Sequence, residues 1–242
     1  MSRGIYVALS GAVAQQTALD NTAQNLANSQ SPGYSRTRVV FREVLAAARG
    51  ETRFGTASET VLDRSQGALR TTGRQLDVAL PEGTFLAVNT SRGERYTRAG
   101  GLSMQPDGAL RTQSGQAVLD EQKKPITLDP LAGEPSITPA GDVMQRGIAV
   151  AQLRTVTFND PSRLAHEEAS VVAATPASGD AKPVAAELQV GMLEDSNGNV
   201  TNAMNEIVTA SRTFEAFQTA IQTFGEIDRK LVNTVPNGGS GG

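Results

Sequence analysis

A long proline-free segment near the C-terminus, from Thr201 to Val232, constrains the fold more than any other part of the chain. Apolar residues recur along it at alternating steps of four and three, the pattern of one face of a helix that packs against another helix. A helix of this length spans about 48 Å, because each residue adds about 1.5 Å. It therefore needs a partner. The positions of this C-terminal stripe are Ala203, Ile207, Ala210, Phe214, Phe217, Ile221, Phe224, Asp228 and Leu231, of which Asp228 alone is charged.

A second, thinner stripe lies at the other end of the chain, in residues 3–28, and predicts an N-terminal helix. That helix would be about 24 residues long and so about 12 Å shorter than the C-terminal one. It can cover only part of the C-terminal stripe, so the uncovered part must face the chain's own β domain or other chains. The positions of this N-terminal stripe are Ile5, Leu9, Ala12, Gln16, Leu19, Ala23 and Leu26.

The N-terminal helix is expected to end abruptly in a turn formed by Ser31-Pro32-Gly33-Tyr34. Pro32 presets its φ angle, and Gly33 can adopt a positive φ. Asn25 and Asn28 are the most distinctive polar residues before the turn. Two interpretations stay open for them: hydrogen bonding between subunits, and local capping of the helix end, which is slightly favoured.

The middle of the chain indicates β structure. Thr84–Val88 is a short apolar run between turn residues, and glycine-containing turns recur at roughly strand-length spacing, as antiparallel hairpins require. The expected fold is α+β, with N- and C-terminal helices pairing as a coiled-coil-like stalk and a central antiparallel β-rich domain. The expected segments are an N-terminal helix and turn (1–34), a connecting β or extended segment (35–72), the β-rich domain (73–186), the C-terminal helix (187–235) and a disordered Gly/Ser tail (236–242).

The composition excludes several functions. The chain has no cysteine, which removes disulfides, thiolate metal sites and cysteine nucleophiles. Its net charge of −3 gives no reason to expect nucleic acid. We find no phosphate-binding loop, dinucleotide fingerprint or calcium-loop spacing, so no cofactor, metal or small-molecule substrate is expected. The chain shows neither an 18-residue apolar run nor a cleavable signal peptide, so membrane insertion is not expected.

The single histidine, His166, is the one candidate for catalysis, because it stands beside Glu167 and Glu168. A histidine next to a carboxylate can act as a general base. No partner nucleophile accompanies it, so the favoured interpretation is a solvated surface histidine, and an enzyme is the minor alternative.

Five motifs, in order along the chain, resemble those of the bacterial flagellar axial proteins, the rod, hook and hook-associated subunits. The short segment between Phe41 and Gly67 is most similar in length to the proximal rod subunit. The motifs are Asn25–Asn28 with Ser31–Tyr34; Gly67–Leu69, Thr72–Gly73 and Leu76–Leu80; Tyr96–Gly100 with Asp107–Leu110; Leu193–Asn197; and Ser211–Glu215.

The resemblance implies a structural subunit of the flagellar rod that assembles with copies of itself and with neighbouring rod proteins and transmits torque. It also implies passage through the flagellar type III export apparatus and a location in the basal body, in the rod that crosses the periplasm. The alternatives are a distal rod or hook-type subunit, and a non-polymerising soluble binding module with paired terminal helices. The residues expected to carry assembly are Ile5, Leu9, Leu19, Asn25, Leu26, Asn28, Pro32, Gly33, Tyr34, Ile207, Phe214, Phe217, Ile221, Phe224 and Leu231.

Overall fold

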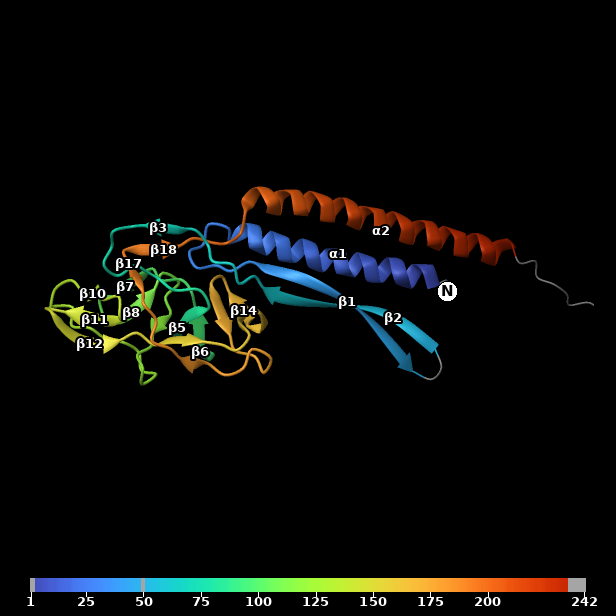
Figure 1. The fold of residues 1–242 in the computed structure, drawn as a ribbon. Coiled ribbons are helices and arrows are strands. Elements are labelled where there is room, and N and C mark those ends of the chain that lie inside the picture. Colours follow the sequence, from blue (N-terminus) through green and yellow to red (C-terminus); the bar gives the residue numbers. More distant parts are fainter. Residues whose placement is uncertain (1–2, 49–50, 235–242) are drawn as a thin grey trace, which may run out of the picture. The chain divides into compact units, whose positions relative to one another are not determined.

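The chain forms two compact units, one mainly helical and one made of β-strands (Figure 1). The computed structural model describes residues 3–48 and 51–234; of residues 3, 4, 41–58, 228 and 231–234 it describes the backbone alone. The helical unit takes the chain up to Leu26, then Arg38–Thr60, and then the chain from Val200 onward. The β unit takes Ala27–Thr37 and Val61–Asn199. The predicted α+β class, with a helix at each end and a β-rich middle, is confirmed. The expected disordered tail, residues 236–242, lies outside the described residues.

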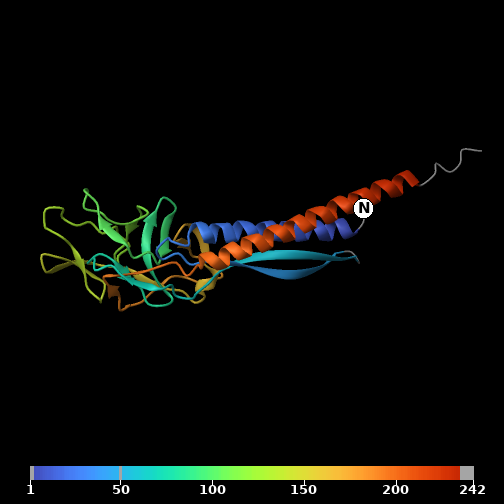
Figure 2. The same cartoon turned by 90° about the horizontal axis from the view of Figure 1, so that it is seen from above.

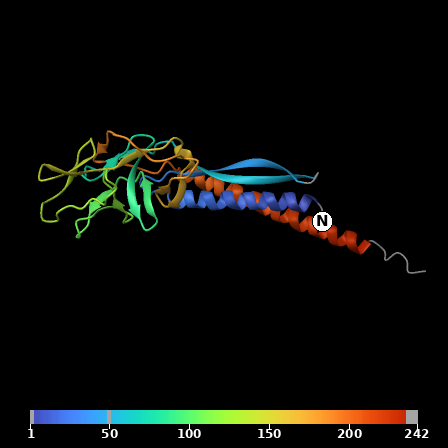
Figure 3. The same ribbon diagram turned by 90° about the horizontal axis from the view of Figure 1, so that it is seen from below.

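The two predicted helices form, with bounds close to those of the two apolar stripes. Of the segment 187–235 expected for the C-terminal helix, however, Gln189–Val190 and Met192–Glu194 form strands, and the helix begins only at Val200. Helix α1 spans Arg3–Ala27 and helix α2 spans Val200–Thr234. They run in opposite directions, next to each other in Figure 1 and crossing one another in the views of Figures 2 and 3. Among the described residues, neither helix is both long and apolar enough to cross a membrane.

The helices meet where Gly11 of α1 faces the ring of Phe217 of α2. A Cβ atom added at Gly11 would lie 2.5 Å from Cε1 of Phe217. This is closer than two carbon atoms can approach, so the absence of a side chain at position 11 permits the contact.

The buried face of α1 differs from the predicted stripe at every second position. Ala8 and Ala12 are buried, as are Thr22 and Asn25, whereas Leu9 is 50% exposed and Gln16 and Ala23 are exposed. A helix face can be traced from Ile5 with a step of four first, which reaches Leu9, or with a step of three first, which reaches Ala8. The apolar pattern alone does not decide between these two faces. Small residues such as Ala8 and Ala12 face inward here and let neighbouring elements approach closely, while several larger apolar side chains are exposed: Tyr6, Val7, Leu9 and Val13.

The helical unit also contains a hairpin, strands β1 (Thr37–Ala48) and β2 (Glu51–Leu62), which pair as a two-stranded sheet. Only a connecting β or extended segment was expected over 35–72. Residues 37–41, which are rich in β-branched and aromatic side chains, favour a strand at the start of β1, but nothing in the sequence pattern predicts strands of 12 residues each.

The β unit is built around one antiparallel sheet. Its strand order is β14-β15-β6-β5-β9-β8-β7, and β13 pairs with both β5 and β16. The predicted strand at Thr84–Val88 is confirmed as part of β5, the best-connected strand of the sheet. The strands are β5 (Thr84–Thr90), β6 (Gly93–Thr97), β7 (Leu102–Met104), β8 (Leu110–Thr112), β9 (Ala117–Val118), β13 (Thr155–Thr157), β14 (Ala165–Glu168), β15 (Val171–Ala173) and β16 (Lys182–Pro183).

Three smaller sheets accompany it, and a short 3-10 helix, Pro161–Arg163, precedes β14. One sheet is β10 (Ser136–Ile137), β11 (Asp142–Gln145) and β12 (Ile148–Gln152). The other two join segments from opposite ends of the unit: β4 (Val78–Ala79) with β17 (Gln189–Val190), and β3 (Leu69–Thr71) with β18 (Met192–Glu194). The chain entering the unit is thus paired with the chain leaving it.

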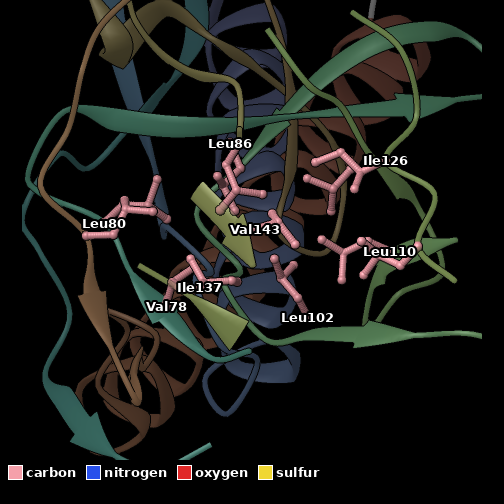
Figure 4. Close-up of a cluster of buried hydrophobic side chains, with 12 residues drawn as sticks. Val78, Leu80, Leu86, Leu102, Leu110, Ile126, Ile137 and Val143 are labelled. Carbon is pink, nitrogen blue, oxygen red and sulfur yellow. The ribbon is translucent and has the colours of Figure 1, made fainter. Parts of the chain in front are cut away.

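The interior of the β unit holds two clusters of buried apolar side chains. The larger cluster includes Leu86, Leu102, Leu110 and Val143, and Figure 4 shows these side chains pointing toward one another. The second cluster contains three aromatic rings among aliphatic side chains: Phe158 packs edge-on against Phe85 and Tyr96, with ring centroids 5.7 and 4.9 Å away. The unit therefore has its own core and holds the segments that lead to the helices.

Candidate functional site

Motifs that lie far apart in the sequence converge in one region of the β unit. The turn after α1, the segment after β2, the end of β6 and the segment before α2 all contribute to it. We call this region the junction and define it by Gly33, Gly67, Arg98, Glu194 and Asn197. Each of these residues belongs to one of the motifs identified in the sequence.

The turn at Ser31–Tyr34 has the predicted geometry. The Tyr34 N–H donates to the Ser31 carbonyl oxygen over 3.2 Å, and Gly33 has a φ of +67°. Pro32 followed by a glycine with positive φ is typical of a type II turn. The Gly33 N–H donates to the Glu194 carbonyl oxygen over 2.8 Å, which ties this turn to the segment before α2.

Position 33 requires glycine for a second reason. A Cβ atom there would lie 2.2 Å from the backbone nitrogen of Ala99. The turn is therefore pressed directly onto the backbone of the segment that follows β6.

Arg98 and Glu194 form a buried ion pair at the centre of the junction. The Arg98 Nε and Nη2 atoms donate to Oε2 of Glu194 over 3.0 and 2.5 Å, and both side chains are almost fully buried. The other Arg98 N–H groups donate to the carbonyl oxygens of Leu80, Pro81 and Thr84. All five donors of the guanidinium are thus used, which is what a buried charge needs.

Glu194 also holds the segment that follows β2. Its Oε1 atom accepts from the Gly67 N–H over 3.0 Å, and the Asp195 N–H donates to the Ala68 carbonyl oxygen over 2.9 Å. A Cβ atom at Gly67 would lie 1.8 Å from the Asp195 carbonyl oxygen, so this approach also requires glycine.

Asn197 completes the junction. Its side chain accepts from the backbone N–H of Arg36 and donates to the carbonyl oxygens of Asp63 and Ser65. Arg36 and Asp63 also pair directly, with Nε 2.7 Å from Oδ2. The segments flanking the β1–β2 hairpin are therefore tied to one another and to the segment before α2.

His166 lies near the junction, and the prediction that it is a solvated surface residue is wrong. Its ring packs against Tyr34 with centroids 5.0 Å apart, and both ring nitrogens are buried without a side-chain partner. Burial lowers the pKa of His166, because the charged imidazolium loses its hydration, while the nearby backbone of Ser35 acts weakly in the opposite direction. The sequence could not reveal this environment, because Tyr34 comes from the distant turn.

The turn residues expected to carry assembly belong to the junction, whereas the helical ones do not. Gly33 and Tyr34 are buried and Pro32 is partly buried. Asn28 accepts from the Ser31 hydroxyl over 3.3 Å, and Asn25 donates to Asn21 over 3.3 Å, so both make bonds within their own segment.

The expected assembly residues on the helices vary in exposure. Asn25 is buried, Leu9 is exposed, and the side chain of Leu231 lies outside those described, as does that of Asp228. The partly buried members are Ile5, Leu19 and Leu26 on α1, and Ile207, Phe214, Phe217, Ile221 and Phe224 on α2.

The sequence-based choice of site residues missed Arg98, Glu194 and Asn197. All three lie inside the motifs Tyr96–Gly100 and Leu193–Asn197, so the motifs themselves were the signal. What the sequence could not give is the pairing between motifs about 100 residues apart.

The junction offers little to a cofactor or a metal. Among the side chains that the structure describes, no three His, Asp or Glu residues cluster as metal ligands. A cavity of about 330 Å³ lies beside the junction and is open to solvent. Charged side chains of both signs line it, including Asp63, Arg64 and Glu82, together with Leu62 and Phe85. The ion pair and hydrogen bonds of the junction hold four chain segments together.

Two family models match the chain. The "Flagellar hook protein FlgE/F/G D1 domain" matches residues 82–145, within the β unit, and the "Flagellar basal body rod FlgEFG protein C-terminal" family matches residues 189–234. The second match covers the end of the junction and α2.

Curated relatives match over nearly their whole length. The flagellar basal-body rod protein FlgF of Rhizobium meliloti is 31% identical over 89% of this chain and 90% of its own length. FlgF of Caulobacter vibrioides is 28% identical over 96% of this chain and 97% of its own length. The rod protein FlgG of Bacillus subtilis is 30% identical over 96% of this chain and 99% of its own length.

Proposed function

The chain belongs to the flagellar basal-body rod protein family, F type, as a structural rod subunit, and we propose that it forms the proximal part of the drive shaft and transmits torque. In this proposal, residues 1–34 and 187–235 form the axial core, 35–72 connect it to the outer part, and 73–186 form the outward-facing β domain. Its partners are copies of itself and neighbouring rod proteins.

The observation that carries the assembly proposal is the burial pattern of α1. Ala8 is 5% exposed, whereas Tyr6, Leu9 and Val13 are each half exposed or more. A helix that had only to stabilise a monomer would bury its large apolar side chains and expose the small ones. The opposite arrangement favours a helix whose outer face is completed by another chain.

Helix α2 supports the same proposal. Met204 and Val208 are exposed on it, and its inward stripe is only partly buried by the chain itself. We propose that the stripes of α1 and α2 pair as a coiled-coil-like stalk, for which the close approach of Gly11 and Phe217 is the supporting contact. Because α2 is ten residues longer, with 35 residues against 25, part of its stripe is left for neighbouring subunits.

We further propose that the chain is not an enzyme and that it reaches the rod, across the periplasm, through the flagellar type III export apparatus. The structural character of the family supports the first point. So does His166, since neither ring nitrogen is accessible for proton transfer.

The experiment that tests the proposal places the chain in the organelle. An epitope-tagged chain should co-purify with basal bodies, and a density map of those basal bodies should show it at the proximal level of the rod. A chain absent from purified basal bodies would contradict rod membership. Density at a distal level or in the hook would favour the distal or hook-type alternative.

A further inference from the structure

We propose that Asn197 is a positioning residue that holds three of the four places where the chain passes between its two units. The inference rests on the proposed function as a torque-transmitting subunit. The chain crosses between the units after Leu26, after Thr37, after Thr60 and after Asn199. A turning force that enters through the helices can reach the β unit along the chain at these four crossings.

Asn197 bonds to residues beside three of them. Its Oδ1 accepts from the Arg36 N–H over 2.7 Å, beside the second crossing. Its Nδ2 donates to the carbonyl oxygens of Asp63 and Ser65 over 3.2 and 2.8 Å, just after the third. Asn197 itself lies shortly before the fourth. One side chain therefore spans the entry to β1, the exit from β2 and the entry to α2.

The position requires an amide. The Arg36 N–H demands an acceptor, and the two carbonyl oxygens demand a donor, so the orientation of the amide is fixed by its partners. An aspartate would keep the acceptor for Arg36 but would set a negative oxygen against two carbonyl oxygens. An alanine would lose all these side-chain bonds.

The two hairpin segments do not depend on Asn197 to stay together. Arg36 and Asp63 are joined by their ion pair and by a backbone hydrogen bond of 2.9 Å from the Asp63 N–H to the Arg36 carbonyl oxygen. The loss of the Asn197 side chain should therefore loosen residues 196–199 from Arg36, Asp63 and Ser65, while the hairpin segments stay paired. The hydrogen bonds that Glu194 and Asp195 make to residues 67 and 68 should remain. The centre of the β-unit core is formed by other residues and should be unaffected.

Amide hydrogen exchange on the purified chain tests the contact directly. In Asn197→Ala the Arg36 amide should exchange with solvent about tenfold faster, because it loses the acceptor of its hydrogen bond. Asn197→Asp keeps the acceptor, so it should increase the exchange rate of the Arg36 amide less than Asn197→Ala does. Asn89→Ala, which makes the same change at an exposed position of β5, should leave it unchanged. The Leu86 amide should not change in any variant. An unaltered Arg36 exchange rate in Asn197→Ala would overturn the proposal.

Torque measurement tests the consequence. Basal bodies of the Asn197→Ala strain should contain the subunit, and tethered cells should rotate normally at low load but deliver at least about twofold less torque near stall. Wild-type torque at every load would overturn the mechanical role, as would a folded variant that fails to enter basal bodies. If instead the wild-type chain is itself absent from basal bodies, the proposed function fails, while the exchange experiment still decides whether Asn197 holds the crossings.

Discussion

Arg98 and Glu194 are about 100 residues apart in sequence, yet they form a buried ion pair that joins the end of β6 to the end of β18. The pair is enclosed by carbonyl oxygens on the arginine side and by the Gly67 N–H on the glutamate side. A buried pair of this kind need not add much net stability, but the loss of one partner leaves the other charged and unpaired.

Arg98→Ala should therefore destabilise the β unit by about 3–5 kcal/mol, because the Glu194 carboxylate and three carbonyl oxygens lose their donor. For a unit of this size that corresponds to a fall in Tm on the order of 10 °C, which thermal unfolding followed by circular dichroism would detect. Arg111→Ala is the control, since Arg111 makes an exposed pair with Asp107 and should shift Tm little. Equal Tm values for the two variants would contradict the assigned role of Arg98.

Gly33→Ala should destabilise the chain through two effects, a positive φ and a clash with the Ala99 backbone. Gly73→Ala separates them, because Gly73 has a φ of +73° but no atom within 4 Å of an added Cβ. The control should cost about 1–2 kcal/mol, the usual penalty for a left-handed residue with a side chain. Gly33→Ala should lower the free energy of unfolding by clearly more than this in the same denaturant titration. Similar costs would show that the contact with Ala99 relaxes easily.

His166 should make the β unit less stable in mild acid. Its folded pKa lies below the ordinary value of 6.5, so between these two values the unfolded chain binds more protons than the folded chain. The free energy of unfolding is therefore highest above pH about 6.5 and falls as the pH is lowered from there toward the folded pKa.

Thermal unfolding between about pH 7.5 and 5.5 measures this slope. His166→Phe keeps an aromatic ring against Tyr34 but cannot titrate, so its Tm should change less over the window. Glu167 does not obscure the result: the hydrogen bond from Arg95 lowers its pKa, so it titrates below this range. If Tm changes with pH by the same amount in the wild type and in His166→Phe, titration of His166 does not contribute to the acid sensitivity.

The parts of the fold that depend on local pattern could be predicted from the sequence. Both helices follow from the spacing of their apolar residues, and the turn at Gly33 follows from the Pro-Gly pair. The burial of His166 and the pairing of Arg98 with Glu194 could not be predicted, because each depends on which distant segments meet. The buried face of α1 could not be predicted for a different reason: apolar spacing does not show whether a face is covered by the chain itself, and here Leu9 is exposed and Ala8 buried.

Phe217→Ala should weaken the packing between α1 and α2. The ring is only partly buried in the single chain, so we expect a loss of about 1–2 kcal/mol, less than for a fully buried phenylalanine. Far-UV circular dichroism during urea unfolding would report the loss of helix, with the exposed neighbour Gln218→Ala as control. Gly11→Leu should also be destabilising, because its side chain would overlap the ring.

The double variant Gly11→Leu/Phe217→Ala tests whether the two residues meet. The new leucine would then occupy space left by the ring, so the double variant should be less destabilised than the sum of the two single ones. Additive losses would contradict a direct contact between Gly11 and Phe217.

Leu9→Ala separates folding from assembly. Half of the Leu9 side chain is exposed, so its removal should change the stability of the purified chain by less than about 1 kcal/mol, and alanine is an equally good helix former. In a rod, full burial of this leucine against another subunit would contribute about 1.5–3 kcal/mol per copy. The variant should therefore be expressed and folded but recovered in basal bodies at a reduced level, with swimming impaired. Gln16→Ala, an exposed polar position of α1, is the matched control and should assemble normally. If Leu9→Ala enters basal bodies at the wild-type level, the outward-facing side of α1 is not an assembly surface, because an apolar contact repeated in every copy along the rod cannot be lost without effect.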